Sequence, residues 1–191
     1  MNDNVIIYGG AFNPPTIAHL EIGKFIRKKF PSKRLVYLPT NDYYNKDLLA
    51  PFENRIEMLN LLIKHLDENV SISDYEFNND SYKGTYYTLK HFNHPYFVIG
   101  ADSLKTLSTW INGKLLIKEN RFIVFPRDGF DVNEIIESDE NLKSNKDNFI
   151  IISDNEFEKS DISSSEYRYN KNKNVLLEEI IEYIKEKGLY R

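Results

Sequence analysis

The feature that most constrains the fold is a regular alternation of short apolar runs with segments of helical periodicity. Six runs have the length and the β-branched or aromatic content of strands, at residues 5–8, 34–38, 70–75, 96–99, 121–125 and 149–152. Strands that alternate with helices are typical of a parallel sheet, because parallel neighbours need a crossover that a helix usually supplies. The sequence therefore predicts a doubly wound α/β fold, with helices on both faces of a parallel sheet.

Helical periodicity extends over residues 17–29, 52–66 and 175–187. Each segment has apolar side chains three and four positions apart, so each helix should bury one stripe. In the first helix the predicted stripe consists of Ile22, Phe25, Ile26 and Lys29. Gly188 follows the last segment and is expected to be its C-cap.

Composition limits the kind of molecule. With 191 residues, of which 41% are apolar, the chain suits one domain over residues 1–191. A net charge of -4 argues against a general nucleic-acid binder, so any phosphate site must be local. The absence of cysteine excludes disulfides, thiolate catalysis and Cys-based zinc sites. We find no secretory signal and no apolar run of about 20 residues, so we expect a cytoplasmic protein without a membrane partner.

The most unusual segment follows the first predicted strand, which ends at Gly9 and Gly10. Ligands bind beyond the carboxyl ends of strands in such sheets, and two glycines permit a tight turn and a close backbone approach. The helix after this turn offers free N–H groups to an anion. Thr16 is expected to cap that helix, with His19 on the same face as a donor to phosphate. An ordinary turn, with Thr16 as a cap and His19 as a satisfied polar residue, is the alternative.

Three separated motifs carry a family resemblance. They are GGAFNPPTIAH at residues 9–19, FVIGADSL at 97–104 with Trp110, and ISSSEYR at 162–168. In order and spacing, over nearly the whole chain, they resemble the nicotinate mononucleotide adenylyltransferases of the (T/H)xGH nucleotidyltransferase superfamily. The resemblance implies a Rossmann-like fold that transfers the adenylyl group of ATP to nicotinate mononucleotide, giving deamido-NAD and pyrophosphate in NAD biosynthesis.

The resemblance also implies roles for individual residues on the ATP side. Thr16, His19 and Arg168 would be the catalytic contacts to the triphosphate, with the planar fork of Arg168 on the β and γ phosphates. The other implied ATP-binding residues are Gly9, Gly10, Ala11, Phe12, Asp102, Ile162, Ser163, Ser164 and Ser165. Asp102 would accept hydrogen bonds from ribose, and Ser164 or Ser165 is expected to cap a helix. Mg²⁺ is expected to arrive with the ATP phosphates, without a ligand set of its own in the protein.

The acceptor side is implied by weaker matches. Trp110 would stack on the pyridine ring, with Thr85 near that ring, whereas Trp110 in the core is the alternative. Lys46, in a long loop that could act as a lid, and Arg127 would contact the mononucleotide. Arg55 lies in a segment that resembles the R-x-x-M-L helix of the family, where the arginine would be structural. For Lys46, Arg55 and Arg127, a solvated surface position is an equal alternative.

Two departures from the family pattern lie at the expected ATP site. Thr16 replaces the usual first histidine, and Ala18 replaces the glycine of (T/H)xGH. Thr16 is usual in the pantetheine-phosphate adenylyltransferases, which are the nearest alternative. A nucleotide-binding module without catalysis and a flavodoxin-like binding domain are two others. The sequence does not decide between nicotinate and nicotinamide mononucleotide, and it leaves a homo-oligomer open.

Overall fold

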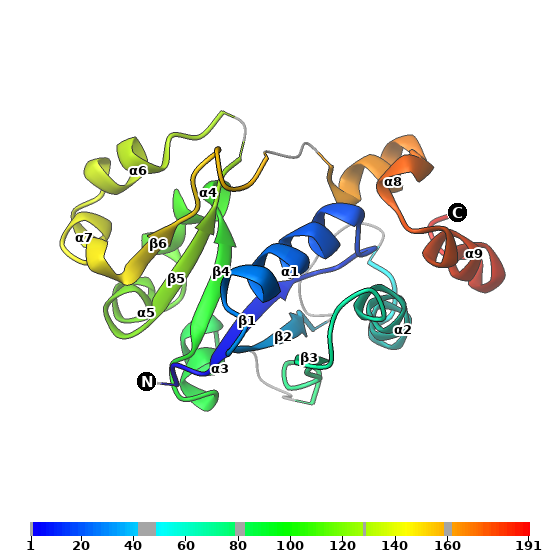
Figure 1. Cartoon of the computed structure of the whole chain (residues 1–191), viewed down its shortest axis with the longest axis horizontal. Helices are drawn as coiled ribbons and strands as arrows, with labels where there is room; N and C mark the ends of the chain where they lie inside the picture. The colour runs from blue at the N-terminus through cyan, green and yellow to red at the C-terminus, as the bar shows by residue number, and fades with distance from the viewer. Residues whose placement is uncertain (1, 42–48, 79–82, 128, 159–161) are drawn as a thin grey trace. The chain divides into compact units, whose positions relative to one another are not determined.

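The computed structural model describes residues 2–41, 49–78, 83–127, 129–158 and 162–191 (Figure 1). Its strands are β1 (Val5–Gly10), β2 (Arg34–Pro39), β3 (Val70–Ile72), β4 (Tyr96–Gly100), β5 (Arg121–Phe125) and β6 (Phe149–Ile151). They are ordered β3-β2-β1-β4-β5-β6, which is the strand order of Rossmann-like folds. The predicted α/β class is confirmed, and each predicted strand is present, although the third ends at Ile72 and not at residue 75.

Helices connect these strands. The α-helices are α1 (Ile17–Lys29), α2 (Phe52–Ile63), α3 (Thr85–His91), α4 (Ala101–Leu104), α5 (Gly113–Glu119), α6 (Val132–Ser138), α7 (Glu140–Lys143), α8 (Ser164–Asn170) and α9 (Glu178–Lys187). The described residues also form the short 3-10 helices η1 (Leu107–Thr109), η2 (Lys146–Asn148) and η3 (Lys173–Val175). The predicted bounds of α1 are confirmed, whereas α2 ends three residues before the predicted limit.

The chain forms two compact units, which we describe separately. The first unit contains residues 1–9 and 81–161, and the second contains residues 10–80 and 162–191. The chain therefore enters the second unit twice, at Gly10, which is the last residue of β1, and again before α8. The expectation of one domain over residues 1–191 stays a prediction.

The first unit is built on the parallel strands β1, β4, β5 and β6. The register places Ile7 beside Phe97, Phe97 beside Phe122 and Phe122 beside Phe149. The rings of Phe122 and Phe149 are stacked with centroids 5.2 Å apart. Aromatic and β-branched neighbours of this kind stabilise adjacent strands through side-chain packing. This buried row is part of the core of the first unit.

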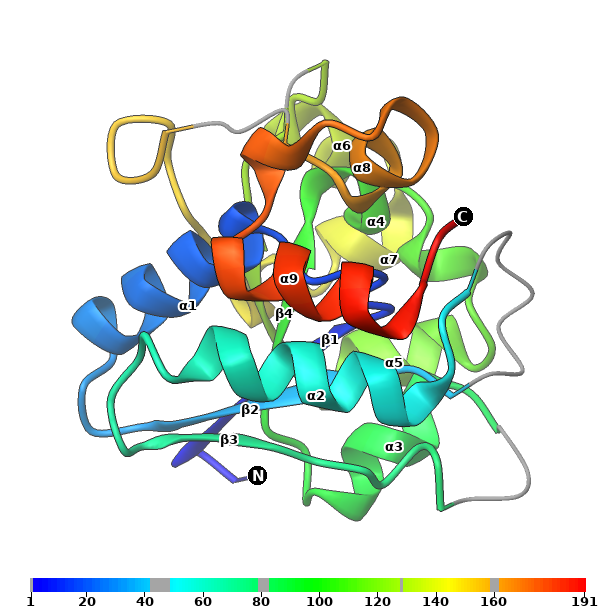
Figure 2. The same cartoon turned by 90° about the vertical axis from the view of Figure 1, so that its right-hand side faces the viewer.

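The second unit packs helices against β2 and β3, which are parallel. Figures 1 and 2 both show α9 alongside α2. Ile180, Ile181 and Ile184 are buried on α9, as predicted, and Gly188 ends the helix at a φ of 63°. His65, two residues beyond the end of α2, lies 2.5 Å from the carboxylate of Glu179 on α9, and this hydrogen bond lowers the pKa of the Glu179 carboxyl.

The buried face of α1 differs from the predicted stripe. Its buried residues are Leu20, Gly23, Ile26 and Arg27, so Ile26 alone of the predicted stripe is fully buried. Gly23 leaves room for Tyr37, because a Cβ at this position would lie 2.2 Å from the tyrosine oxygen. Arg27 can be buried because its guanidinium N–H groups donate to a carboxylate and to backbone carbonyls.

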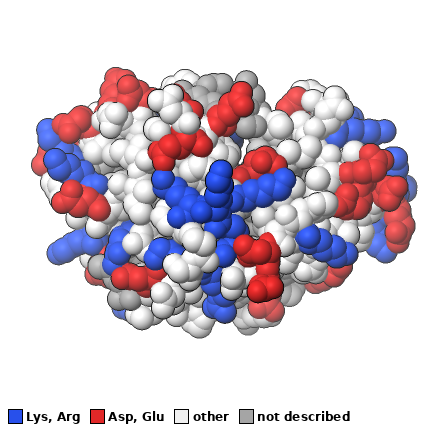
Figure 3. All heavy atoms as spheres, viewed as in Figure 1, with Lys and Arg blue, Asp and Glu red and all other residues white. Residues whose placement is uncertain are grey.

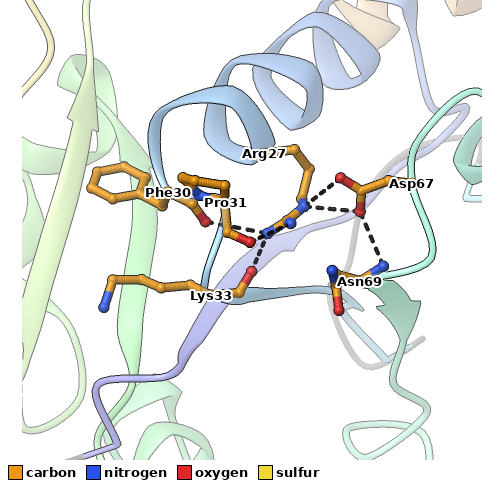
Figure 4. Close-up of polar contacts among 6 residues, drawn as sticks. All are labelled: Arg27, Phe30, Pro31, Lys33, Asp67 and Asn69. Carbon is orange, nitrogen blue, oxygen red and sulfur yellow. Dashed lines mark hydrogen bonds and ion pairs between the residues drawn. The ribbon is translucent and has the colours of Figure 1, made fainter.

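Arg27 binds the turn that follows α1 (Figure 4). Its Nε lies 3.0 Å from both carboxylate oxygens of Asp67. Its terminal nitrogens donate to three backbone carbonyls, those of Phe30, Pro31 and Lys33. A buried guanidinium is stable only when it is paired and hydrogen-bonded in this way.

Basic side chains gather in the middle of the face shown in Figure 3, where Figure 1 places α1. Lys28 and Lys29 are exposed in the last turn of this helix. Positive charge at a helix C-terminus is favourable because the helix dipole is negative there. Among the described residues, no helix has both the length and the apolar character needed to cross a membrane. The cytoplasmic location and the oligomeric state stay predictions.

Candidate functional site

The loop between β1 and α1 is held by hydrogen bonds to its backbone carbonyls. Gly10, the last residue of β1, accepts a bond from the Thr40 N–H at 2.9 Å. Further along, Arg55 donates to the Ala11 carbonyl at 2.9 Å. Side chains from outside the loop also bond Asn13 and Pro14, as described below. The loop is therefore fixed at several points before α1 begins.

The special backbone conformation of this loop lies at Phe12 and not at the two glycines. Phe12 has a φ of 46°, while Gly9 and Gly10 are residues of β1. A Cβ at Gly9 would lie 2.8 Å from the ring of Phe97, so this glycine makes room for a core side chain. The expectation that the glycines form the tight turn is thus wrong. Both glycines are instead the last two residues of β1, directly before the loop.

Thr16 and His19 form a capping box at the start of α1. The Thr16 N–H donates to Nδ1 of His19 at 2.9 Å, and the Thr16 carbonyl accepts from the His19 N–H at 3.0 Å. The threonine hydroxyl lies 2.7 Å from the same Nδ1. The expected cap at Thr16 and the expected shared face are both present.

This geometry assigns the tautomer of His19. Because a backbone N–H only donates, Nδ1 must be the unprotonated nitrogen, and the proton of the neutral ring belongs on Nε2. The edge of the ring packs against Phe12, with ring centroids 5.1 Å apart. Tyr37 adds a hydrogen bond to the His19 carbonyl at 2.9 Å. His19 is thus a preoriented donor at the N-terminus of a helix.

The second motif opens α8. Ser163 is the N-cap, and its hydroxyl accepts the Glu166 N–H at 3.3 Å. The expectation that Ser164 or Ser165 caps this helix is wrong, because the helix begins at Ser164 and the cap is the residue before it. Ile162 directly precedes the cap.

The hydroxyls of the next two serines do not cap the helix and make other hydrogen bonds. Ser164 donates to the Pro14 carbonyl at 2.8 Å, and Ser165 accepts from Arg168 at 3.0 Å. The Arg168 fork also donates to the Asn13 carbonyl at 2.6 Å. Ser164 and Pro14 are 150 positions apart in the chain. The two motifs are therefore in direct contact within the second unit.

Arg168 is well placed to bind an anion. It is half-buried, and a guanidinium has five N–H donors. Two of its nitrogens are bonded as described, while Nε is buried without a hydrogen-bond partner among the described residues. Together, Arg168 and His19 provide donors from two helices of one unit.

Arg55 is a structural residue. Its side chain is fully buried, at 0% exposure, so the surface alternative for it is wrong. Its Nε donates to the Ala50 carbonyl at 3.1 Å, in addition to the bond to Ala11. It therefore ties the loop after β1 to the residues that precede α2.

Two residues of this network were missed by sequence reasoning. Asn13 is buried, and its Oδ1 accepts hydrogen bonds from the Ala50 N–H at 3.0 Å and the Tyr190 hydroxyl at 2.7 Å. An asparagine ahead of two prolines was a signal for Asn13. Tyr190 had none, because nothing near it in the sequence indicates a contact 177 positions away.

The remaining predicted residues of the described chain belong to the first unit. Asp102, in α4, faces Arg127 with 3.8 Å between a carboxylate oxygen and Nε. Both side chains are partly exposed, so this pair contributes little to stability. Burial raises the pKa of Tyr8, and the charges of Arg127 and Asp102 act on the same hydroxyl in opposite directions. Tyr8 is thus an uncharged hydroxyl beside this pair.

Thr85 and Trp110 lie on neighbouring segments of the first unit. Thr85 is the first residue of α3, and a Cβ on Gly84 before it would lie 2.9 Å from Ile111, which follows Trp110. Trp110 is half-buried, so it is not a core residue, and its indole N–H donates to Thr106 at 3.2 Å. Lys46 lies outside the described residues.

Comparison with known proteins places these features in a family. The model of the family described as cytidylyltransferase-like matches residues 7–170 of this chain. A protein of Acholeplasma laidlawii named "probable nicotinate-nucleotide adenylyltransferase" is 39% identical, over 97% of this chain and 97% of its own. One of the same name from Clostridium acetobutylicum is 32% identical, over 96% of this chain and 97% of its own.

A solved structure is similar over the same extent. It is the nicotinic acid mononucleotide adenylyltransferase of Plasmodium falciparum in complex with NaAD. The TM-score is 0.79 at 25% identity, and the match covers 99% of this chain and 98% of that one.

Proposed function

Because this chain belongs to the cytidylyltransferase-like family, together with the nicotinate-nucleotide adenylyltransferases, we propose that it transfers the adenylyl group of ATP to nicotinate mononucleotide. The products are deamido-NAD and pyrophosphate, in the synthesis of NAD. The single observation that carries this proposal is the contact between the two anion-binding motifs in the second unit. It supports a site in which both motifs bind one triphosphate.

The reaction needs no covalent intermediate with the protein. A phosphate oxygen of the mononucleotide attacks the α-phosphorus of ATP, a new P–O bond forms, and the bond from that phosphorus to the bridging oxygen breaks. The bonding electrons leave with pyrophosphate. The task of the protein is to align the two nucleotides and to stabilise the charge that accumulates on the phosphate oxygens.

The donors of the second unit suit this task. His19 presents Nε2–H and Arg168 a planar fork, and both hold their orientation through hydrogen bonds made before ATP arrives. Preorganised donors stabilise a transition state because no reorganisation is needed as charge develops. We assign the β and γ phosphates to Arg168, with His19 at the N-terminus of α1.

The residues of the first unit suit the nucleoside and pyridine groups. The Asp102 carboxylate can accept hydrogen bonds from ribose hydroxyls, and the half-buried Trp110 offers an indole face to an electron-poor ring. Thr85 lies on the segment beside Trp110. Lys46 and Arg127 are proposed contacts of the mononucleotide phosphate.

Mg²⁺ is proposed to enter with ATP. The described residues contain no cluster of three His, Asp or Glu side chains that could hold a metal ion, and the groups assigned to the triphosphate, His19 Nε2–H and the Arg168 guanidinium, are donors that fit phosphate oxygens. Magnesium in such enzymes keeps most of its waters and binds substrate phosphates. When bound, it supplies charge neutralisation at the triphosphate, and the residues named above position that triphosphate.

The direct test is pyrophosphate release with different acceptors. The protein is incubated with ATP, Mg²⁺ and either nicotinate mononucleotide, nicotinamide mononucleotide or phosphopantetheine. We expect pyrophosphate and deamido-NAD with nicotinate mononucleotide, at a higher kcat/KM than with the amide. Release with phosphopantetheine alone would contradict the proposal in favour of the pantetheine-phosphate enzyme, and no release with any acceptor would indicate a binding module.

A further inference from the structure

The penultimate residue of the chain reaches the loop of the proposed phosphate site. Tyr190 is buried, and its hydroxyl donates to Oδ1 of Asn13 at 2.7 Å. Asn13 is itself buried, and its backbone carbonyl is the acceptor of the Arg168 fork. A single residue of the loop therefore joins the chain end to the arginine of the site.

Tyr190 also contacts α8, the helix that carries Arg168. Its ring packs edge-on against Tyr167, with centroids 5.9 Å apart. Its backbone carbonyl accepts a hydrogen bond from the Lys171 ammonium group, and Lys171 is the C-cap of α8. Tyr190 is thus bonded to the loop through its hydroxyl and to α8 through its ring and its carbonyl.

The local backbone supports this arrangement. Tyr190 has a φ of 58° and lies two residues after Gly188, which ends α9 in the left-handed region. A left-handed conformation is costly for a tyrosine, so it persists only where surrounding contacts require it. A tyrosine hydroxyl is protonated at neutral pH and can donate, and burial raises the pKa of the Tyr190 hydroxyl further.

We propose that Tyr190 is a positioning residue for the reaction, which holds the loop of Asn13 and the helix of Arg168 in the relative arrangement that binds the triphosphate. This inference rests on the proposed function. Tyr190 touches neither nucleotide in this account. It acts through Asn13 and α8, so its loss should affect the triphosphate and spare the mononucleotide.

The test is Tyr190→Phe, which removes the hydroxyl and keeps the ring against Tyr167. We expect the KM for ATP to rise about fivefold to tenfold, the equivalent of one net hydrogen bond. The KM for nicotinate mononucleotide should stay within about twofold, since an effect on one substrate alone is not produced by a loss of folded protein. Both constants are measured well below the melting temperature.

Tyr183→Phe is the matched control. Tyr183 lies on α9, and its hydroxyl accepts a hydrogen bond from Asn54 at 3.0 Å, on α2 and not in the loop. Tyr183→Phe removes the same hydroxyl oxygen from a tyrosine near the same end of the chain. Because the Tyr183 hydroxyl does not contact the loop of Asn13, the kinetic constants of this variant should equal those of the wild type. If Tyr190→Phe does not fold, Lys171→Met releases the Tyr190 carbonyl instead and should raise the KM for ATP in the same way.

The outcomes separate the two proposals. A wild-type protein that releases no pyrophosphate with any acceptor contradicts the proposed function. An active wild type with unchanged ATP kinetics in the folded Tyr190 variant overturns the positioning role alone. Equal changes in the KM of both substrates would also overturn it, because they indicate a general loss of structure.

Discussion

At the scale of single residues, His19 completes the cap of α1 and, in the proposed function, also donates a hydrogen bond to phosphate. Its Nδ1 accepts the Thr16 N–H and completes the cap of α1. The same bond sets the tautomer and so makes Nε2 the donor. A capping box usually has Glu or Gln at this position, and neither presents a ring N–H. The helix cap therefore also orients the donor of the site.

Substituting His19 tests the second task. In His19→Ala we expect turnover to fall about 100-fold to 1000-fold, the usual effect of removing one preorganised donor. Pyrophosphate release under saturating substrates measures it. His19→Glu retains a capping-box residue but adds negative charge at the anion site, so it should fold and be at least as inactive.

The control for these variants is His91→Ala, because His91 is exposed, belongs to the first unit and has no assigned role. Its turnover should equal that of the wild type. Near-normal turnover in both folded His19 variants would remove His19 from the mechanism.

Residues of this site differed in how far the sequence could predict them. The pairing of Thr16 with His19 follows from helix geometry alone, because positions three apart share a face. Asn13, Arg55 and Tyr190 bond across long sequence separations, and no local pattern encodes such contacts. Arg55 shows the difficulty clearly, since an arginine on a helix is usually solvated and here is fully buried.

The departure at Ala18 also belongs to the residue scale. Ala18 is half-buried, between the N-cap Thr16 and His19, at the N-terminus of α1. Its methyl group occupies space that the glycine of the family pattern leaves open, and alanine favours the helix more than glycine does.

At the scale of elements, α1 shows why apolar periodicity alone predicted the wrong stripe. The buried face contains Gly23, where Tyr37 needs the space, and Arg27, whose donors all find acceptors. Neither residue is counted as apolar in a periodicity argument. Ile22 and Phe25, which are counted, are half-buried. The hydrogen bonds of Arg27 and the space needed by Tyr37, more than apolar spacing, thus determine which face of this helix is buried.

Removing the Arg27 guanidinium should therefore destabilise the protein. In Arg27→Ala the carbonyls of the turn after α1 lose their donor and Asp67 loses its partner. We expect a loss of about 2–4 kcal/mol in the free energy of unfolding. Chemical denaturation measures it, while the KM for ATP of the folded variant should be unchanged.

Lys28→Ala serves as the comparison for this variant, because it removes the same charge from an exposed neighbour on the same helix. Its stability should stay within about 0.5 kcal/mol of the wild type. Equal effects of the two substitutions would mean that charge, and not the buried hydrogen bonds of Arg27, stabilises this part of the protein.

The serine motif shows a similar limit at the element scale. Three consecutive serines predict a helix start, because serine is a favoured N-cap, but not which of the three is the cap. The structure assigns the cap to Ser163 and leaves the next two hydroxyls to bond Pro14 and Arg168. When neighbouring residues are identical, their sequence does not show at which of them the helix begins.

At the scale of the whole molecule, the strands were the most predictable part. Each predicted strand is present because the central strands β1, β4 and β5 are continuous buried apolar runs, whereas the half-buried β3 is shorter than predicted. The division into two units was not predictable, because the second unit combines residues 10–80 with the chain end. That division brings the loop after β1, α8 and Tyr190 into one unit, and the candidate site depends on it.

The proposed function requires that the motif at the start of α1 and the motif at the start of α8 bind one triphosphate. A crystal structure of this protein with a non-hydrolysable ATP analogue and Mg²⁺ tests this claim most directly. We predict that His19 Nε2 and the Arg168 guanidinium both lie within hydrogen-bonding distance of phosphate oxygens of the same molecule. A triphosphate bound by only one of these side chains, or by neither, would contradict the account.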